Sequence, residues 1–251
     1  MSAAHDVGWP RPAFAAALLA LGAHALVTGD VAGVWGPVPH WFPPPSALRW
    51  ICGVVALGCG VGLAWRGTAA IAARVLLAWL LAWLVFARLV EAALAPGVEG
   101  YWSGCGETLV LAAAAWALAL RADDRSRRVA RVAYGLALIP FGLAHFVYLK
   151  ETIALVPAWL PVATAWALAT GGAYMAAAAA LLAGVCVRLA AVLVAWQIAG
   201  FTALVWLPVA ASGQAVAGQW SETVISLALS AAACVIAAFL HPRSSPPGVS
   251  R

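Results

Sequence analysis

The sequence has very little charge. Of 251 residues, only 9% are Asp, Glu, Lys or Arg, whereas 65% are hydrophobic and the mean hydropathy is +0.96. A soluble domain is about a quarter charged and needs that polar surface to stay in water. This chain cannot cover a water-facing exterior, so we expect a lipid bilayer to be its main solvent. The sequence therefore predicts an all-α integral membrane protein.

Motifs for redox cofactors are also missing. No haem, flavin or iron–sulfur motif is visible, and none of the cysteines forms a CxxC pair. Any electrons would have to come from a partner, and these absences leave the cofactor unknown. The net charge of +5 is typical of arginines that hold cytoplasmic loops, so we expect no nucleic-acid partner.

Hydrophobic runs bounded by Pro, Gly or charge predict eight transmembrane helices. At about 20 residues each, eight helices fill ~160 residues and leave only short loops and tails. The predicted spans are residues 13–29, 46–65, 70–90, 104–120, 130–149, 162–184, 188–208 and 221–240. We expect the first span to be retained as a helix, because it lacks a clear small-x-small cleavage site of a signal peptide.

The arginines fall mainly on one side of this eight-span topology. That side holds Arg11, Arg66, Arg74, Arg121, Arg125, Arg127, Arg128, Arg131, Arg188, Arg243 and Arg251. The opposite side keeps only Arg49, Arg88 and Lys150, each at a helix end. Because positively charged loops stay in the cytoplasm, we expect a multi-pass protein of a bacterial-type inner (plasma) membrane with both termini cytoplasmic.

Four motifs occur twice, in the same order and 115 to 121 residues apart. The pairs are Gly22-x-His24 with Gly142-x-x-His145, residues 38–43 (VPHWFP) with 156–161 (VPAWLP), residues 75–79 (VLLAW) with 192–196 (VLVAW), and residues 102–108 (WSGCGET) with 220–223 (WSET). Each half holds four spans, so both enter the membrane in the same direction. We expect two parallel four-helix repeats: a first module over 1–120, an Arg-rich cytoplasmic linker over 121–131, and a second module over 132–251.

The second half resembles a known family. Gly142-x-x-His145-Phe146, the VPAWLP segment, Gly171 and a small-residue helix ending at Arg188-x-Ala-Ala are similar to the DoxX-like family of four-helix membrane proteins. The resemblance is good over 131–240 and weaker over 13–120, and it implies a tandem, two-module member. Relatives in that family include a subunit of a thiosulfate:quinone oxidoreductase and a maturation protein for a periplasmic amine dehydrogenase. The resemblance therefore implies an oxidoreductase subunit with a periplasmic or membrane redox partner.

Four ionisable residues lie at membrane depth: His24, Glu107, His145 and Glu222. Such groups cost about 2.5–3.5 kcal/mol on insertion scales, which makes them candidates for catalytic residues. All four fall within ~8 Å of the outer interface at 1.5 Å per residue. A carboxylate that accepts from an imidazole N–H raises its basicity, so a His–Glu pair could pass protons or hold a quinone head group.

Two other interpretations of these residues stay open. A His–Glu hydrogen bond could simply tie the first and fourth helices of a module together. Two His and two Glu could also form a metal site if the halves meet at their axis, although spacing alone predicts no metal ligands.

The outer connections are rich in tryptophan, and we expect them to contribute to substrate binding. The candidates are Trp41, Trp102, Trp159 and Trp220, together with Arg88. Alternatively, Trp35 and the other rings form an interfacial aromatic belt, and an i,i+3 ion pair at the interface joins Arg88 to Glu91.

The predicted function is a redox-associated module that binds a quinone or another isoprenoid near its outer face. A scaffold or maturation factor without chemistry, or a transporter of small solutes or lipids, are the alternatives.

Overall fold

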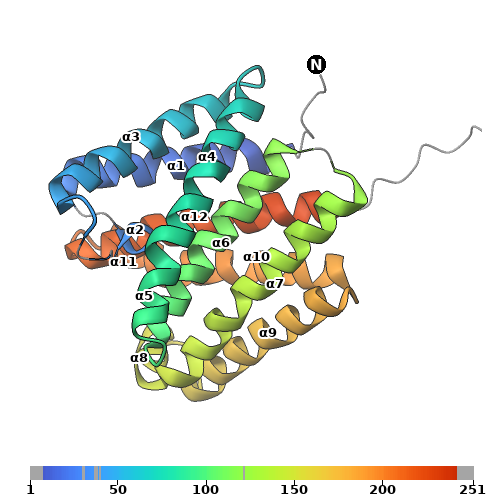
Figure 1. Cartoon of the computed structure of the whole chain (residues 1–251). Coiled ribbons are helices and arrows are strands. Elements are labelled where there is room, and N and C mark those ends of the chain that lie inside the picture. Colours follow the sequence, from blue (N-terminus) through green and yellow to red (C-terminus); the bar gives the residue numbers. More distant parts are fainter. Residues whose placement is uncertain (1–7, 30–31, 37–38, 40, 121, 242–251) are drawn as a thin grey trace, which may run out of the picture.

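The computed structural model describes residues 8–29, 32–36, 39, 41–120 and 122–241. Over these residues the chain is helical and contains no strand (Figure 1). Some predictions lie outside this part of the chain. They concern residues 38 and 40 of the VPHWFP motif, and Arg121, Arg243 and Arg251 of the charge pattern.

Long helices make up most of the fold. Six of them are continuous: α1 (Pro10–Thr28), α3 (Pro45–Ala64), α6 (Glu99–Ala119), α7 (Asp124–Val147), α9 (Ala163–Ala183) and α12 (Ala217–Leu240). Two more contain a π-helical segment: α4 (Ala69–Trp83) continues through η1 (Leu84–Arg88) into α5 (Leu89–Leu94), and α10 (Val187–Phe201) continues through η2 (Thr202–Trp206) into α11 (Leu207–Ala211). The short helices α2 (Ala32–Trp35) and α8 (Leu149–Leu155) lie in the connections after α1 and α7.

Helices are the expected solution for this composition, because lipid offers no partner to backbone N–H and C=O groups. Their ends follow local chemistry. The Asp123 carboxylate accepts from the Ser126 backbone N–H at 2.7 Å and caps the start of α7. Gly29 and Gly184 end α1 and α9 with φ of 75° and 76°, a left-handed conformation that glycine adopts without strain.

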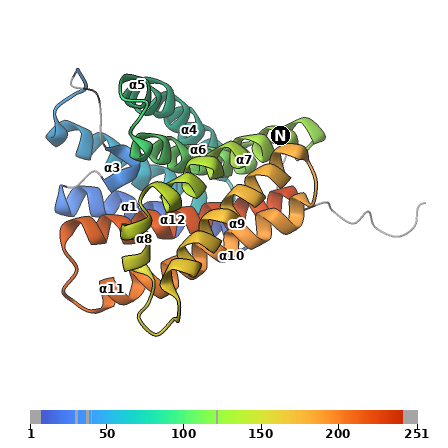
Figure 2. The same cartoon turned by 90° about the horizontal axis from the view of Figure 1, so that it is seen from below.

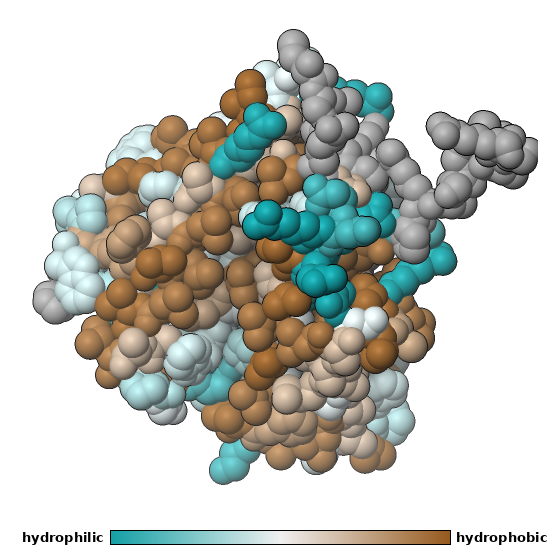
Figure 3. Space-filling view, turned by 45° about the vertical axis from the view of Figure 1, so that its right-hand side comes forward, coloured by the Kyte–Doolittle hydropathy of each residue, from teal (hydrophilic) through white to brown (hydrophobic). Residues whose placement is uncertain are grey.

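In the part of the chain that the structure describes, seven helices are long and apolar enough to cross a membrane, which fits a multi-pass membrane protein. They are α1, α3, α4–η1–α5, α7, α9, α10–η2–α11 and α12. Figure 3 shows one face of the molecule, where apolar residues dominate and the strongly hydrophilic ones are grouped. The remaining predicted span, 104–120, falls in α6, which has 21 residues but is not among the seven. Most of α6 is buried inside the bundle, including Glu99 and Thr108 in its polar first half.

The helices pack around a central contact between α6 and α12 (Figure 1, Figure 2). Helix α4 lies on α6 and α10 lies on α12, while α3 packs on α1 and α9 packs on α7. The two histidine-bearing helices, α1 and α7, pack most extensively on α3 and α9, and next on α12 and α6, respectively. Of the two glutamate-bearing helices, each therefore contacts mainly the one outside its own predicted module, which differs from the within-module contact considered in the sequence.

Glycines allow α7 and α9 to approach closely. A Cβ added to Gly142 would lie 2.7 Å from the Met175 Sδ, and one added to Gly171 would lie 2.7 Å from the His145 Cβ. The next residue, Gly172, has nothing within 4 Å of such a Cβ. Small residues at a contact between membrane helices let the backbones pack tightly, so Gly171 positions α9 against the turn that carries His145.

We expect Gly171→Ala to lower the free energy of unfolding by about 1–3 kcal/mol, because the added methyl group overpacks the contact between α7 and α9. Gly172→Ala is the matched control, and it should keep or slightly raise stability because alanine is the better helix former. Thermal melting of both variants in the same detergent measures the difference. Equal melting temperatures would contradict the close packing at Gly171.

Candidate functional site

A cavity of about 410 Å³ lies between α7, α9 and α10, next to α8 and the segment that follows it. We call it the His145 pocket. Its walls are formed by His145, Thr152, Leu155, Val156, Pro157, Trp159, Leu160, Trp166, Ala167, Thr170, Trp196, Gln197, Gly200, Phe201, Leu204 and Val205. Most of these side chains are aliphatic or aromatic, and the few polar ones come from different helices. That combination is typical of sites for small organic ligands.

His145 is half-buried, and its hydrogen bonding defines its tautomer. The Nδ1 atom lies 2.7 Å from the Phe141 carbonyl oxygen. Because a carbonyl oxygen only accepts, Nδ1 carries the hydrogen, and Nε2 of the neutral ring is an acceptor. The ring also lies against Tyr174, with 5.5 Å between the two centroids. Among the residues that the structure describes, His145 has no glutamate partner, and Glu222 does not line this pocket.

Gln197 provides the second polar side chain in the wall. Its Nε2 donates to the Thr170 carbonyl oxygen at 3.2 Å, and the side chain also interacts with the Tyr174 hydroxyl. Gln197 on α10 and His145 on α7 therefore bring two polar side chains to the same pocket. Of the predicted binding residues, Trp159 lines the pocket and is 69% exposed, as expected for a ring at its rim.

Arg88 lies in the interior of the protein and not at the interface. The side chain is 2% exposed, and its guanidinium donates to the Gly36 carbonyl oxygen. It rests on α6 at Gly104, where an added Cβ would lie 3.0 Å from the Arg88 Cζ. The stronger electrostatic partner is Glu107, and the predicted partner Glu91 is a weaker one. Arg88 ends the π-helical turn η1, whose altered register accompanies this inward direction.

Three of the four predicted catalytic residues gather where α6 meets α12. Glu107 is half-buried and interacts electrostatically with Arg88 and with Glu222, which is exposed. The Nε2 atom of His24 lies 3.0 Å from the Ser221 hydroxyl oxygen, one residue before Glu222. We call Arg88, Glu107 and Glu222 the central charged cluster.

The central charged cluster lies apart from His145, which has its own pocket. Among the described residues, no group of three or more His, Cys, Asp or Glu side chains could hold a metal ion. The site of two histidines and two glutamates that the spacing left open is therefore not assembled.

An aromatic cluster lies around α4, whose VLLAW motif the sequence pairs with the VLVAW motif of α10. Trp35 is 1% exposed and makes an edge contact with Trp83 at a centroid distance of 5.6 Å. Trp79 stacks on Trp83 at 5.5 Å, and Phe42 lies 5.4 Å from the same ring. Trp35 was expected in an interfacial belt, but α2 carries it into the core. An aromatic ring in an outer loop suits either place, so the sequence held no signal that distinguishes them.

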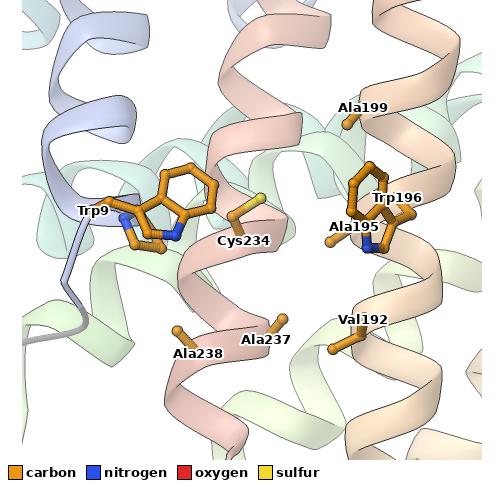
Figure 4. Close-up of a pocket in the computed structure, with 9 residues that line it drawn as sticks. Trp9, Val192, Ala195, Trp196, Ala199, Cys234, Ala237 and Ala238 are labelled. Atoms are coloured by element: carbon orange, nitrogen blue, oxygen red, sulfur yellow. The ribbon is translucent and has the colours of Figure 1, made fainter.

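A second cavity, of about 320 Å³, lies between α12, α10 and the start of α1. Figure 4 shows Cys234 and Ala237 of α12 facing Val192 and Ala195 of α10, with Trp196 beside them. Trp196 also lines the His145 pocket. The walls of this second cavity are largely apolar, so they offer volume but few groups that would orient a ligand.

The other predicted binding residues are spread over the molecule. Trp102 donates from Nε1 to the Pro96 carbonyl oxygen at 3.0 Å and lines a third cavity. Trp41 and Trp220 are exposed in the loop before α3 and on α12. Sequence analysis did not assign Gln197, Tyr174 or Glu99 to a site. Gln197 was noticeable as a polar residue in mid-span, whereas Glu99 had no distinguishing signal.

Comparison of the chain with models of protein families, with curated proteins and with solved structures finds no match. The DoxX-like motifs therefore stay a resemblance in sequence, and the His145 pocket is the main basis for a function.

We expect Arg88→Met to lower the free energy of unfolding by about 3 kcal/mol, because it removes the Gly36 contact and leaves Glu107 without its nearest positive charge. Adding Glu107→Gln to that variant should recover part of the loss, because the uncompensated carboxylate is then removed. Arg74→Met, at an exposed position of α4, is the matched control. Thermal melting of the set provides the measurement. If Arg88→Met and Arg74→Met melt alike, the central charged cluster does not stabilise the fold.

Proposed function

We propose that this chain is a DoxX-like inner-membrane protein that binds the ring of a quinone, or of a related isoprenoid, in the His145 pocket. One observation carries the proposal: His145 and Gln197 converge on an aromatic-lined cavity of about 410 Å³. Typical ligand pockets hold about 300–1,000 Å³, so the volume suits a single ring with part of its tail.

The proposed architecture is eight spans in two parallel modules, residues 1–120 and 132–251, joined by the linker 121–131. Equivalent packing supports it, since α1 lies on α3 and α12 as α7 lies on α9 and α6. The π-helical segments η1 and η2 begin 118 residues apart, at Leu84 and Thr202, within the range of the motif offsets. Helix α6 is the proposed eighth span, and its polar groups face protein, which makes them tolerable at membrane depth.

The residues of the pocket fit both redox states of a quinone head group. Neutral His145 presents Nε2 as an acceptor for a hydroxyl group, and the protonated ring would donate to a carbonyl oxygen instead. Gln197 gives a second polar side chain in the wall, and Trp159 and Trp166 give flat apolar walls. When bound, the quinone would supply two-electron, two-proton chemistry. The part of this chain would be to hold the ring and to move a proton at His145 Nε2.

Electrons would come from a periplasmic or membrane redox partner, because the sequence carries no motif for a redox centre of its own. Placing the pocket at the outer face follows from the arginine pattern, which assigns the connection after α7 to the side opposite the linker.

The orientation can be tested with reporter fusions. We expect green fluorescent protein at the C-terminus to fluoresce, and alkaline phosphatase there to be inactive, because the terminus is cytoplasmic. Phosphatase fused after Ala158 should be active, because that connection lies outside. Fusions at the N-terminus and the C-terminus that report opposite sides would mean an odd number of spans and contradict the eight-span architecture.

The ligand can be identified by mass spectrometry of an organic extract from gently purified protein. We expect stoichiometric quinone or another isoprenoid in the wild type. His145→Ala and Gln197→Leu should each reduce it about tenfold, as expected for losing one hydrogen bond in a buried site. His241→Ala, an exposed histidine after α12, is the matched control and should retain the ligand.

Size-exclusion chromatography establishes that each variant is folded before its extract is compared. Bulk phospholipid alone, unchanged by the two pocket substitutions, would rule out the ligand site. It would favour a scaffold or maturation factor, which a pull-down with one stoichiometric partner would then support.

A further inference from the structure

The largest of the three cavities described, of about 660 Å³, shares no residue with the His145 pocket. It lies between α6, α7 and the η1–α5 segment, and we call it the Glu99 cavity. Its apolar walls include Leu84, Leu109, Leu136, Ile139, Leu143 and Val147. Leu136, Leu143 and Val147 are also exposed on the apolar outer surface of α7, so the cavity opens toward lipid.

One carboxyl group lies in this apolar wall. Glu99 is the first residue of α6 and is 9% exposed. Its Oε1 accepts from the Ser103 hydroxyl at 2.6 Å, whereas its Oε2 is buried and has no hydrogen-bond partner among the described residues. Buried polar atoms in native proteins nearly always have a partner. Among the buried side-chain atoms of the described residues that have none, Oε2 is the one whose residue lines one of the three cavities, so a ligand in this cavity can supply the missing hydrogen bond.

Glu99 lies five residues before the predicted span 104–120. Burial raises the pKa of its carboxyl above the ordinary value, and the Ser103 hydrogen bond opposes this only in part. A raised pKa enlarges the fraction of neutral acid relative to an exposed carboxyl, and a neutral carboxyl group can both donate and accept.

A backbone acceptor lies in the same cavity. Pro140 is inside α7 and has no N–H, so the Leu136 carbonyl oxygen cannot receive the usual helical hydrogen bond. Both Pro140 and Leu136 line the Glu99 cavity. A ligand group that both donates and accepts can satisfy an acid and a carbonyl, and among small neutral groups the hydroxyl does so.

We propose that the Glu99 cavity binds a neutral isoprenoid chain that ends in a hydroxyl group. The hydroxyl bonds the Glu99 Oε2, and the apolar chain lies along Leu136, Leu143 and Val147 toward the lipid. This site is separate from the proposed quinone pocket, and its ligand is held by one acid and not by a histidine.

Tritiated geranylgeraniol, a 20-carbon isoprenoid alcohol, is the probe for equilibrium binding to the full chain in detergent. We expect saturable binding, and competition by its methyl ether at least tenfold weaker than by the alcohol, because the ether cannot donate. Glu99→Leu should weaken binding about tenfold, while Glu99→Gln, which keeps a donor and an acceptor, stays within threefold of wild type. Glu151→Gln, at an exposed position of α8, should bind as wild type.

Binding that is not saturable, or equal competition by the ether, would overturn the proposal. The proposal would also be overturned if the Glu99→Leu variant had the melting temperature of the wild type and bound the alcohol equally well. If Glu99→Leu does not fold, Leu143→Trp decides, because it fills the cavity from the lipid side and should abolish saturable binding without lowering the melting temperature.

His145→Ala should leave binding of the alcohol unchanged. A failure of the Glu99 site is thereby distinguished from a failure of the proposed quinone pocket.

Discussion

Lipid offers no hydrogen-bond partner, so every polar group that this chain carries into the membrane must be satisfied inside the protein. Backbone groups meet this requirement within helices, and even the irregular segments η1 and η2 remain helical. The same requirement explains Arg88, whose guanidinium bonds the Gly36 carbonyl oxygen and lies near Glu107, in a space that only a glycine at position 104 leaves open. Several buried side-chain atoms of the described residues have no hydrogen-bond partner, and Glu99 Oε2 is the one whose residue lines one of the three cavities. Leu136, whose carbonyl oxygen lacks its usual helical donor because of Pro140, lines the same cavity. In a protein surrounded by lipid, such groups mark places where a ligand supplies what water would supply elsewhere.

In the proposed halves, each histidine-bearing helix contacts the last helix of the other half. These contacts determine where the histidines and glutamates lie. Because α6 packs on α12, Glu107 and Glu222 come close enough to interact, and because α1 packs on α12, the His24 ring lies beside Ser221. Had each histidine helix packed chiefly on its own module's last helix, two separate His–Glu pairs would have formed. Instead one histidine joins the central contact and the other is left in a pocket of its own. His24 and His145, which have matching positions in the repeated motif, therefore have different surroundings.

The apolar segments were predictable because hydropathy is a local property. The predicted spans 46–65 and 162–184 match α3 and α9 to within one residue at each end, and the existence of α6 was also predicted. The direction in which a side chain points and the residues that it contacts were not predictable, because they depend on contacts between distant segments. Arg88 and Glu91 have the spacing of a surface ion pair, but the π-helical turn at η1 accompanies an inward Arg88. Trp35 is an aromatic residue in a predicted outer connection, as interfacial rings are, but α2 places its side chain in the core. His145 and Trp159 were predicted as site residues and share one pocket, whereas Gln197 could be assigned to that pocket only once α9 and α10 were packed together.

The proposed halves differ most where the ligand pocket lies. When the VLLAW and VLVAW motifs are aligned, Trp79 corresponds to Trp196, and the next residue, Leu80, corresponds to Gln197. Leu80 is fully buried and has no polar group to offer, and Trp79 stacks on Trp83 beneath Trp35. In the second half Trp196 is 73% exposed and leaves the space beside Gln197 open. Aromatic packing of this kind contributes about 0.5–1.5 kcal/mol per pair beyond the burial of area, so the first half gains stability where the second keeps a cavity. One filled and one hollow copy of the proposed repeat would leave one such pocket per chain, with the proposed first module packed beside it.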